Sequence, residues 1–299
     1  MKEYWGMLGL LLVTIIWGAG FTASDIALQS LEPFQIMAGR FLLAAPLIGV
    51  AGFPRVTKIT RQEWKAGTGM GVFLFAAFAL QTVGLRYTTP SKNAFLTAAN
   101  VVFVPFIAFL FYRKKVRPAE ICGAILALAG VGFLSLERDL RLGLGDALTL
   151  AGAVCFAFQI VLTGKAVEKY RPMALNFVQM ATACICSLAG LVCSRNVKIS
   201  FTAGGVLSVL YLGAVSTALT YLLQTLSQRY VDETKAAVIL SLEAVFGCLF
   251  SVLLLKEHIT LRMLAGAGMI LSAVLIPEIK WKRRLIGNGV GKGENGGKK

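Results

Sequence analysis

The sequence has few charged residues and lacks the motifs that enzymes use for catalysis. Only 15% of its 299 residues are charged, whereas soluble domains carry about 25%. It holds one histidine, His258, and no His-Glu-x-x-His, Gly-x-Ser-x-Gly or phosphate-binding Gly-x-x-x-x-Gly-Lys-Ser/Thr motif. These absences exclude a soluble enzyme and a self-contained ATP-driven pump. We predict that the chain is not an enzyme and needs no cofactor.

The cysteines form neither a zinc motif nor a disulfide framework. No Cys-x-x-Cys pair occurs, and a zinc site needs several Cys, His or carboxylate ligands close together. All six cysteines lie inside apolar runs, which excludes a disulfide-rich secreted module: Cys122, Cys155, Cys184, Cys186, Cys193 and Cys248. No metal site is expected.

Long hydrophobic runs fill almost the whole chain. Hydrophobic residues make up 57% of it, and about 20 helical residues cross the hydrocarbon core of a bilayer. The runs lack the alternation of barrel strands, so they are predicted to be helices. Polar residues, prolines and glycines divide the chain into ten predicted transmembrane helices at 5–28, 34–52, 66–84, 93–112, 118–136, 146–165, 173–194, 204–227, 236–255 and 260–278. The predicted fold class is an all-α integral membrane protein embedded in the lipid bilayer.

The net charge of +15 follows from the predicted topology. With a cytoplasmic N-terminus, the inner segments hold 21 of the 30 Lys and Arg residues and the outer segments hold 8. Basic residues concentrate in cytoplasmic loops. We therefore predict a multi-pass protein of the cell membrane with both termini cytoplasmic. Nucleic acid is not needed to explain the charge and is not an expected partner.

The chain resembles itself at an offset of 143 residues. Residues 80–94 and 223–237 share seven identities in fifteen positions, several of them polar. Because the repeated unit has five helices, its second copy must cross the membrane in the opposite direction. We predict two inverted five-helix repeats, 1–140 and 141–279, followed by a disordered basic tail at 280–299. Many secondary transporters are built this way, with the substrate site near the midplane.

Short segments of the sequence match a family pattern. The first helix contains Trp-Gly-Ala-Gly-Phe at 17–21, and the ninth contains Leu-Glu-Ala-Val-Phe at 242–246, followed by Leu-Leu-Leu-Lys-Glu at 253–257. With these segments the sequence resembles the EamA family of the drug/metabolite transporter superfamily, over roughly residues 5–278. The resemblance implies alternating-access transport of small-molecule substrates, with export of metabolites such as amino acids or related compounds. Drug efflux or uptake on the same fold, and a non-transporting membrane receptor, are the alternatives.

Polar and aromatic side chains mark a candidate substrate pathway. By the resemblance, the first, third, fourth, sixth, eighth and ninth helices surround a central cavity. A primary amide in hydrocarbon is costly unless it meets a partner, water or a ligand. The candidates are Trp17, Phe21, Gln81, Asn100, Gln159, Tyr221, Gln224 and Glu243. The alternative is that such groups only hydrogen-bond between helices and stabilise their packing.

Two charges fall inside predicted helices. An unpaired charge at the bilayer centre costs about 2.5–3.5 kcal/mol or more, so each is expected to face a partner or water. The family pattern places Arg40 outside the cavity lining, which favours a structural role. Glu243, whose repeat equivalent is Asn100, has two open interpretations. In the first, it binds a cation or carries a coupling proton. In the second, it holds neighbouring helices together through a hydrogen bond.

The fifth and tenth predicted helices carry faces of small residues. One face contains Gly123, Ala127 and Gly130, and the other contains Ala265, Gly268 and Ser272. Small residues let helix backbones approach closely. These faces indicate packing within the chain or a homodimer contact.

Overall fold

Helices make up all of the regular structure in the described part of the chain. The computed structural model describes residues 1–113, 118–135, 143–194, 202–256, 260–262, 264–270 and 272–273. A helix satisfies its own backbone hydrogen bonds, which is what a segment in hydrocarbon requires. The predicted all-α fold class is confirmed.

The helices follow the predicted ranges closely. The first half contains α1 (Lys2–Leu28), α2 (Pro33–Ala51), the 3-10 helix η1 (Arg55–Lys58), α3 (Arg61–Leu85), α4 (Pro90–Ala98), α5 (Asn100–Tyr112) and α6 (Pro118–Ser135). The second half contains α7 (Leu144–Val167), α8 (Pro172–Cys193), α9 (Ala203–Leu210), the π-helix η2 (Tyr211–Leu219), α10 (Thr220–Ser227), α11 (Glu233–Leu240) and α12 (Glu243–Leu255). The described residues between 261 and 273 are also helical.

Most of these helices are long enough to cross a membrane. Eight spans in the described residues have the length and hydropathy required, with α4–α5, η2 with its flanking helices, and α11–α12 each counted as one span. The helix α6 adds a shorter apolar stretch at Ile121–Gly130. Together with the helical residues between 261 and 273, these match the ten predicted helices. The predicted tail at 280–299 lies outside the described residues.

Helix starts are encoded by prolines and capping residues. Pro33, Pro90 and Pro172 each occupy the first helical turn, where the missing N–H would have no partner in any case. At the start of α3, the Thr60 hydroxyl accepts a hydrogen bond from the Glu63 backbone N–H at 3.2 Å, and the Glu63 carboxylate accepts one from the Thr60 N–H at 2.9 Å. This reciprocal capping box fixes where the helix begins.

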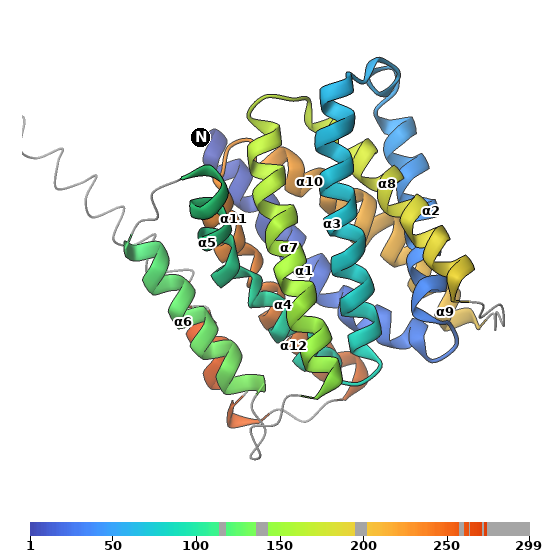
Figure 1. The fold of residues 1–299 in the computed structure, drawn as a ribbon. Coiled ribbons are helices and arrows are strands. Elements are labelled where there is room, and N and C mark those ends of the chain that lie inside the picture. The colour runs from blue at the N-terminus through green and yellow to red at the C-terminus, as the bar shows by residue number, and fades with distance from the viewer. Residues whose placement is uncertain are drawn as a thin grey trace, which may run out of the picture.

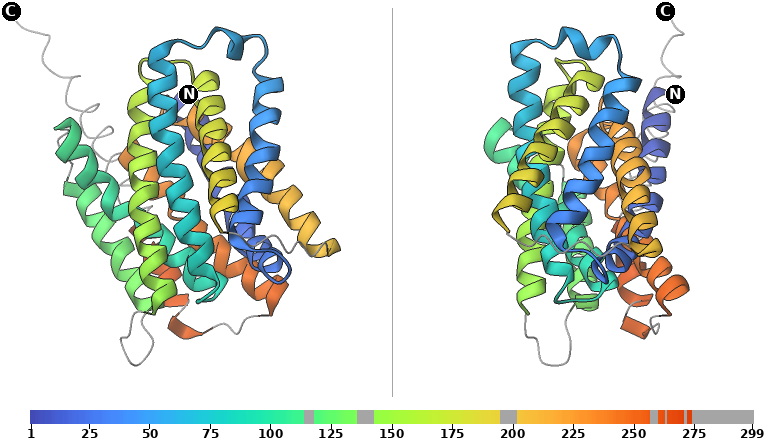
Figure 2. Two further views of the ribbon diagram at one scale, coloured as in Figure 1. Left: turned by 45° about the vertical axis from the view of Figure 1, so that its right-hand side comes forward. Right: turned by 90° about the vertical axis from the view of Figure 1, so that its right-hand side faces the viewer.

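The two halves run in opposite directions. In Figure 1 the N-terminus and the α2–α3 and α7–α8 connections lie at one end of the bundle, and α7 begins at the other end. Figure 2 shows α6 at the edge of the bundle, where it contacts α4 and α5. A Cβ added at Gly130 of α6 would lie 2.9 Å from the Gly266 carbonyl oxygen. The fifth helix therefore packs against the tenth within one chain, through Gly130 on one side and Gly266, Met269 and Ile270 on the other. The expected small-residue face of the tenth helix does not make this contact: Ala265 and Gly268 are exposed, and a Cβ added at Gly268 would meet nothing within 4 Å.

Equivalent positions of the two halves share the same irregularities. The fourth predicted helix is broken after α4, so that Asn100 begins α5. The ninth is broken after α11, so that Glu243 begins α12, and these two first residues are 143 positions apart. Arg113 and Lys256, also 143 apart, adopt left-handed backbone angles, with φ of 52° and 57°. The internal repeat thus extends to breaks and helix ends that were not predicted.

Two ion pairs also follow the repeat. Lys92 lies 2.9 Å from the Asp146 carboxylate, and Lys235 lies 2.8 Å from that of Glu3. Lysine and carboxylate are each 143 residues from their counterparts. Each pair joins one half of the chain to the other, at opposite ends of the bundle, where α7 and α1 begin (Figure 1).

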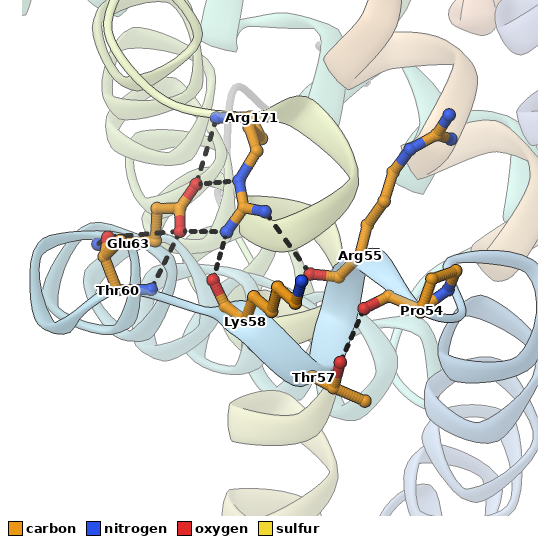
Figure 3. A network of polar contacts seen from close by, with 7 residues as sticks. All are labelled: Pro54, Arg55, Thr57, Lys58, Thr60, Glu63 and Arg171. Atoms are coloured by element: carbon orange, nitrogen blue, oxygen red, sulfur yellow. Dashed lines mark hydrogen bonds and ion pairs between the residues drawn. The ribbon is translucent and has the colours of Figure 1, made fainter.

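A further contact between the halves joins the start of α3 to the start of α8. The Arg171 guanidinium, at the start of α8, donates to both carboxylate oxygens of Glu63 at 2.8 and 2.7 Å (Figure 3). It also donates to the Lys58 carbonyl oxygen at 2.5 Å. The hydrogen bonds that the Glu63 carboxylate accepts raise the pKa of Arg171 above its usual value. We call the contact of Arg171 with Glu63 and Lys58 the clasp.

Candidate substrate cavity

A cavity lies between the two halves, beside the helix breaks. The space between its lining atoms, including the open solvent at its mouth, is about 470 Å³. It is lined by Trp17, Gly20, Phe21, Ser24, Arg40, Phe78, Gln81, Thr97, Asn100, Phe156, Gln159, Ile160, Ser216, Tyr221 and Glu243. Helices from both halves contribute, as expected for a site between inverted repeats.

Most of the candidate pathway residues meet in this cavity. Seven line it, namely Trp17, Phe21, Gln81, Asn100, Gln159, Tyr221 and Glu243. The eighth, Gln224, lies one layer behind, where its Nε2 donates to Gln159 Oε1 at 3.3 Å. Gln81 donates to the Thr97 hydroxyl at 2.9 Å, so part of its hydrogen-bonding capacity is used by the cavity wall.

Arg40 lines the cavity as well, and the expectation that it lies outside the lining is wrong. Its side chain is buried, its Nε donates to the Thr217 hydroxyl at 3.0 Å, and its guanidinium carbon lies 3.9 Å from the centre of the Phe78 ring. An aromatic face attracts a cation but does not neutralise it. Among the described residues, no carboxylate lies within ion-pair distance of Arg40. Its charge is therefore available to an anionic group in the cavity.

Glu243 brings a carboxylate to the same cavity. It is buried at 4% exposure and stands at the start of α12, where the helix dipole favours a negative charge. It makes no hydrogen bond or ion pair with any residue in the described part of the chain. The Oδ1 atom of its repeat equivalent, Asn100, is also buried without a partner there. The cavity thus presents two acceptor groups that no neighbouring side chain satisfies.

An aromatic wall, formed by Trp17, Phe78, Phe156 and Tyr221, lines part of the same cavity. The Trp17 ring centre lies 5.0 Å from that of Tyr221, and Phe78 lies 6.0 Å from Tyr221 and 5.2 Å from Phe156. Trp17 Nε1 donates to the Ser216 carbonyl oxygen at 3.1 Å, so this donor is used within the protein. This wall gives the cavity an apolar surface in addition to the polar side chains of Arg40 and Glu243.

The π-helix η2 shapes one side of the cavity. Arg40 and Trp17 hydrogen-bond to Thr217 and Ser216, which both lie within this nine-residue segment. A π-helix is rare and occurs mostly at functional sites. Helical periodicity in the sequence predicts the span but not its widened turns.

Comparison with known proteins assigns the chain to a family. The sequence model of the EamA-like transporter family matches residues 4–136 and again 143–277. The chain belongs to the EamA-like transporter family. It is 33% identical to a protein of Archaeoglobus fulgidus named an uncharacterized transporter, over 94% of this chain and 88% of that protein. It is 29% identical to a protein of Salmonella typhimurium named a probable amino-acid metabolite efflux pump, over 89% of this chain and 92% of that protein. A crystal structure with 19% identity superposes with a TM-score of 0.75, covering 93% of this chain and 98% of that one, and so shares the fold.

This EamA protein also contains buried amides that the sequence analysis missed. Gln159 Nε2 donates to Gln179 Oε1 at 3.0 Å, and Gln179 Nε2 donates to Asn176 Oδ1 at 2.8 Å. All three side chains are buried. Asn176 and Gln179 are three residues apart on one face of an otherwise apolar helix, and that spacing is the signal that could have identified them.

Proposed function

We propose that this EamA protein exports small zwitterionic metabolites, amino acids or related compounds, by alternating access. The observation that carries the proposal is that an arginine and a glutamate side chain line the same cavity. Both Arg40 and Glu243 are buried, both line the cavity, and neither forms an ion pair with another described residue.

The chemistry of a zwitterion fits these two charges. A guanidinium binds a carboxylate through two parallel N–H donors, and Arg40 uses its Nε on Thr217 while its remaining donors are left for a ligand. A substrate ammonium group is a donor to the Glu243 carboxylate and to the free Asn100 Oδ1. One negative and one positive group on the substrate would leave the occupied cavity without an uncompensated charge, which lowers the cost of holding it in the membrane.

The aromatic wall supports a solute with an apolar side chain. Trp17, Phe78, Phe156 and Tyr221 line the same cavity as the two charges. Ligand sites in proteins combine mostly apolar walls with a few polar groups that fix orientation. We expect amino acids with apolar or aromatic side chains to bind more tightly than small polar ones.

The depth of the cavity in the membrane follows from where its lining residues lie along their helices. In the proposed topology, α1 runs outward and α2 runs inward. Phe21 and Ser24 lie in the last third of α1, and Arg40 lies in the first half of α2, whereas Gln159 and Tyr221 lie past the middle of the inward-running spans α7 and Ala203–Ser227. The cavity therefore extends from the middle of the membrane toward its outer side. We propose that the repeats 1–140 and 141–279 rock against each other in the cell membrane, with both termini cytoplasmic, and release the substrate outside.

Transport by purified protein in liposomes tests the proposal. Liposomes loaded with an unlabelled neutral amino acid should accumulate the labelled compound by saturable counterflow. Binding without counterflow would favour a receptor, and counterflow of apolar amines but not of amino acids would favour drug efflux. In cells loaded with labelled amino acid, overexpression should speed its loss; faster accumulation would indicate uptake.

A further inference from the structure

A row of buried polar side chains continues from the cavity toward one end of the bundle. Gln159 lines the cavity, and its Nε2 donates to the Thr163 hydroxyl at 3.0 Å, one turn further along α7. Gln224 lies on α10, and Gln228 follows one turn later as the residue that caps the C-terminus of this helix. Gln228 Nε2 donates to the Ile160 carbonyl oxygen at 3.0 Å. We call Gln159, Thr163, Gln224, Gln228 and Glu233 the polar seam.

The seam continues to Glu233 at the start of α11. A Cβ added at Gly164 would lie 3.3 Å from Glu233 Oε2 and 3.6 Å from Gln228 Nε2. The amide and the carboxylate therefore converge on the same point of α7, where the absence of a side chain leaves room for them. Glu233 is buried at 1% exposure.

Beyond Glu233 the seam reaches the surface. Lys165 Nζ lies 3.9 Å from Glu233 Oε1, and its side chain is 23% exposed. Lys165 is six residues from Gln159 on α7, which corresponds to about 9 Å along the helix. This is the end of the bundle that holds the N-terminus (Figure 1), the cytoplasmic end in the proposed topology.

Packing between helices does not account for the seam. The Oε1 atoms of Gln224 and Gln228 are buried and have no hydrogen-bond partner among the described residues. An unsatisfied buried amide is destabilising, and an apolar side chain would fill the same space. The repeat equivalent of Gln228 is Leu85, which is also buried. The fold thus accepts an apolar residue at this position in one half and carries an amide in the other.

A closed transport path explains these groups. In alternating access the half of the path that is closed in one state is hydrated in the other, and amide oxygens that lack partners when closed would then bind water or solute. We infer that the polar seam is the cytoplasmic half of the transport path in its closed state, with Gln228 and Thr163 lining it. The inference rests on the proposed transport function, and the solutes that pass are small and carry hydrogen-bonding groups.

Thiol labelling from the cytoplasmic side tests this inference. In a background without the six native cysteines, Gln228→Cys and Thr163→Cys are made separately; the Thr163 change is close to isosteric. Inside-out vesicles are treated with a small membrane-impermeant methanethiosulfonate. The matched control is Ser187→Cys, at a fully buried α8 position whose hydroxyl bonds only to the Ala183 carbonyl oxygen of its own helix.

We expect both seam cysteines to react at least about tenfold faster than the Ser187→Cys control, because opening of the path hydrates the seam. Addition of a transported solute should change the rate at which these two cysteines are labelled. Gln228→Leu should lower counterflow about tenfold, equivalent to about 1.4 kcal/mol in the barrier, while leaving binding at the outer cavity intact.

Two outcomes separate this inference from the proposed function. If amino-acid counterflow occurs while both seam cysteines react no faster than the control, the seam is a packing feature and the inference is overturned. If both cysteines react from the cytoplasmic side but no zwitterion is transported, the path is supported and the proposed substrate is wrong.

Discussion

Replacing Glu243 with glutamine removes one charge from the cavity and keeps the size of the side chain. A hydrogen bond to a charged group contributes about 1.5–3 kcal/mol, and each 1.4 kcal/mol is a factor of about ten in affinity. Glu243→Gln should therefore raise the KM for a zwitterionic solute roughly 10–150-fold. Folding should survive, because the carboxylate has no ion-pair partner among the described residues that would be left unsatisfied.

The assay compares two modes of transport in liposomes. Counterflow at equal pH measures substrate exchange, and uptake driven by a pH gradient measures coupled transport. If Glu243 holds the substrate ammonium, both modes weaken together through KM. If it carries a coupling proton, gradient-driven transport is lost while exchange persists. Asn100→Ala is the control, since it removes the repeat-related acceptor without changing charge. Wild-type KM and pH dependence in Glu243→Gln, with normal expression, would refute both roles.

Three further predictions concern packing, the clasp and topology. Gly18→Ala should lower stability by about 1–3 kcal/mol, measured by thermal unfolding in detergent, because the added methyl would lie 2.8 Å from a backbone nitrogen of α12. Arg171→Ala leaves the buried Glu63 carboxylate without its main partner and should lower the melting temperature by roughly 5 °C. Single cysteines at Thr89 and Asp232 should differ in labelling: an impermeant reagent outside intact cells reaches the first, and reaches the second only after permeabilisation.

Each of these predictions has a matched control. Gly69→Ala should be tolerated, because a Cβ there meets nothing within 4 Å. Arg86→Ala should change the melting temperature little, since its ion pair with Glu32 is partly exposed. Unchanged melting temperatures in Gly18→Ala or Arg171→Ala would contradict the packing or the clasp. Equal labelling of both single cysteines from outside would contradict the inverted topology.

The helices could be predicted from sequence because the membrane imposes a simple rule. Every span must be apolar and about 20 residues long, and prolines such as Pro33, Pro90 and Pro172 mark where spans begin. The boundaries consequently agree to within a few residues. The breaks before Asn100 and Glu243 could not be predicted, because each run is largely apolar on both sides of the polar residue and no proline or glycine lies within two residues of it.

The cavity was only partly predictable. Amides such as Gln81 and Gln159 are conspicuous in an apolar helix, since each must find a partner. The expected position of Arg40 was wrong because the family pattern indicates only which helices line the cavity, and α2 is not among them. Whether a side chain of α2 reaches the cavity depends on how α2 packs against η2. Gln179 was missed for a similar reason: its partner Gln159 is on another helix, and sequence spacing does not reveal contacts between helices.

The central claim is that one cavity recognises both charges of a zwitterion. The most direct measurement is competition against counterflow of a labelled neutral amino acid in liposomes. Three unlabelled competitors share one side chain: the intact amino acid, the amine without the carboxylate, and the acid without the amino group. With Arg40 and Glu243 each binding one group, the intact amino acid should compete at least about tenfold better than either analogue. An amine or acid that competes as well as the amino acid would contradict the account.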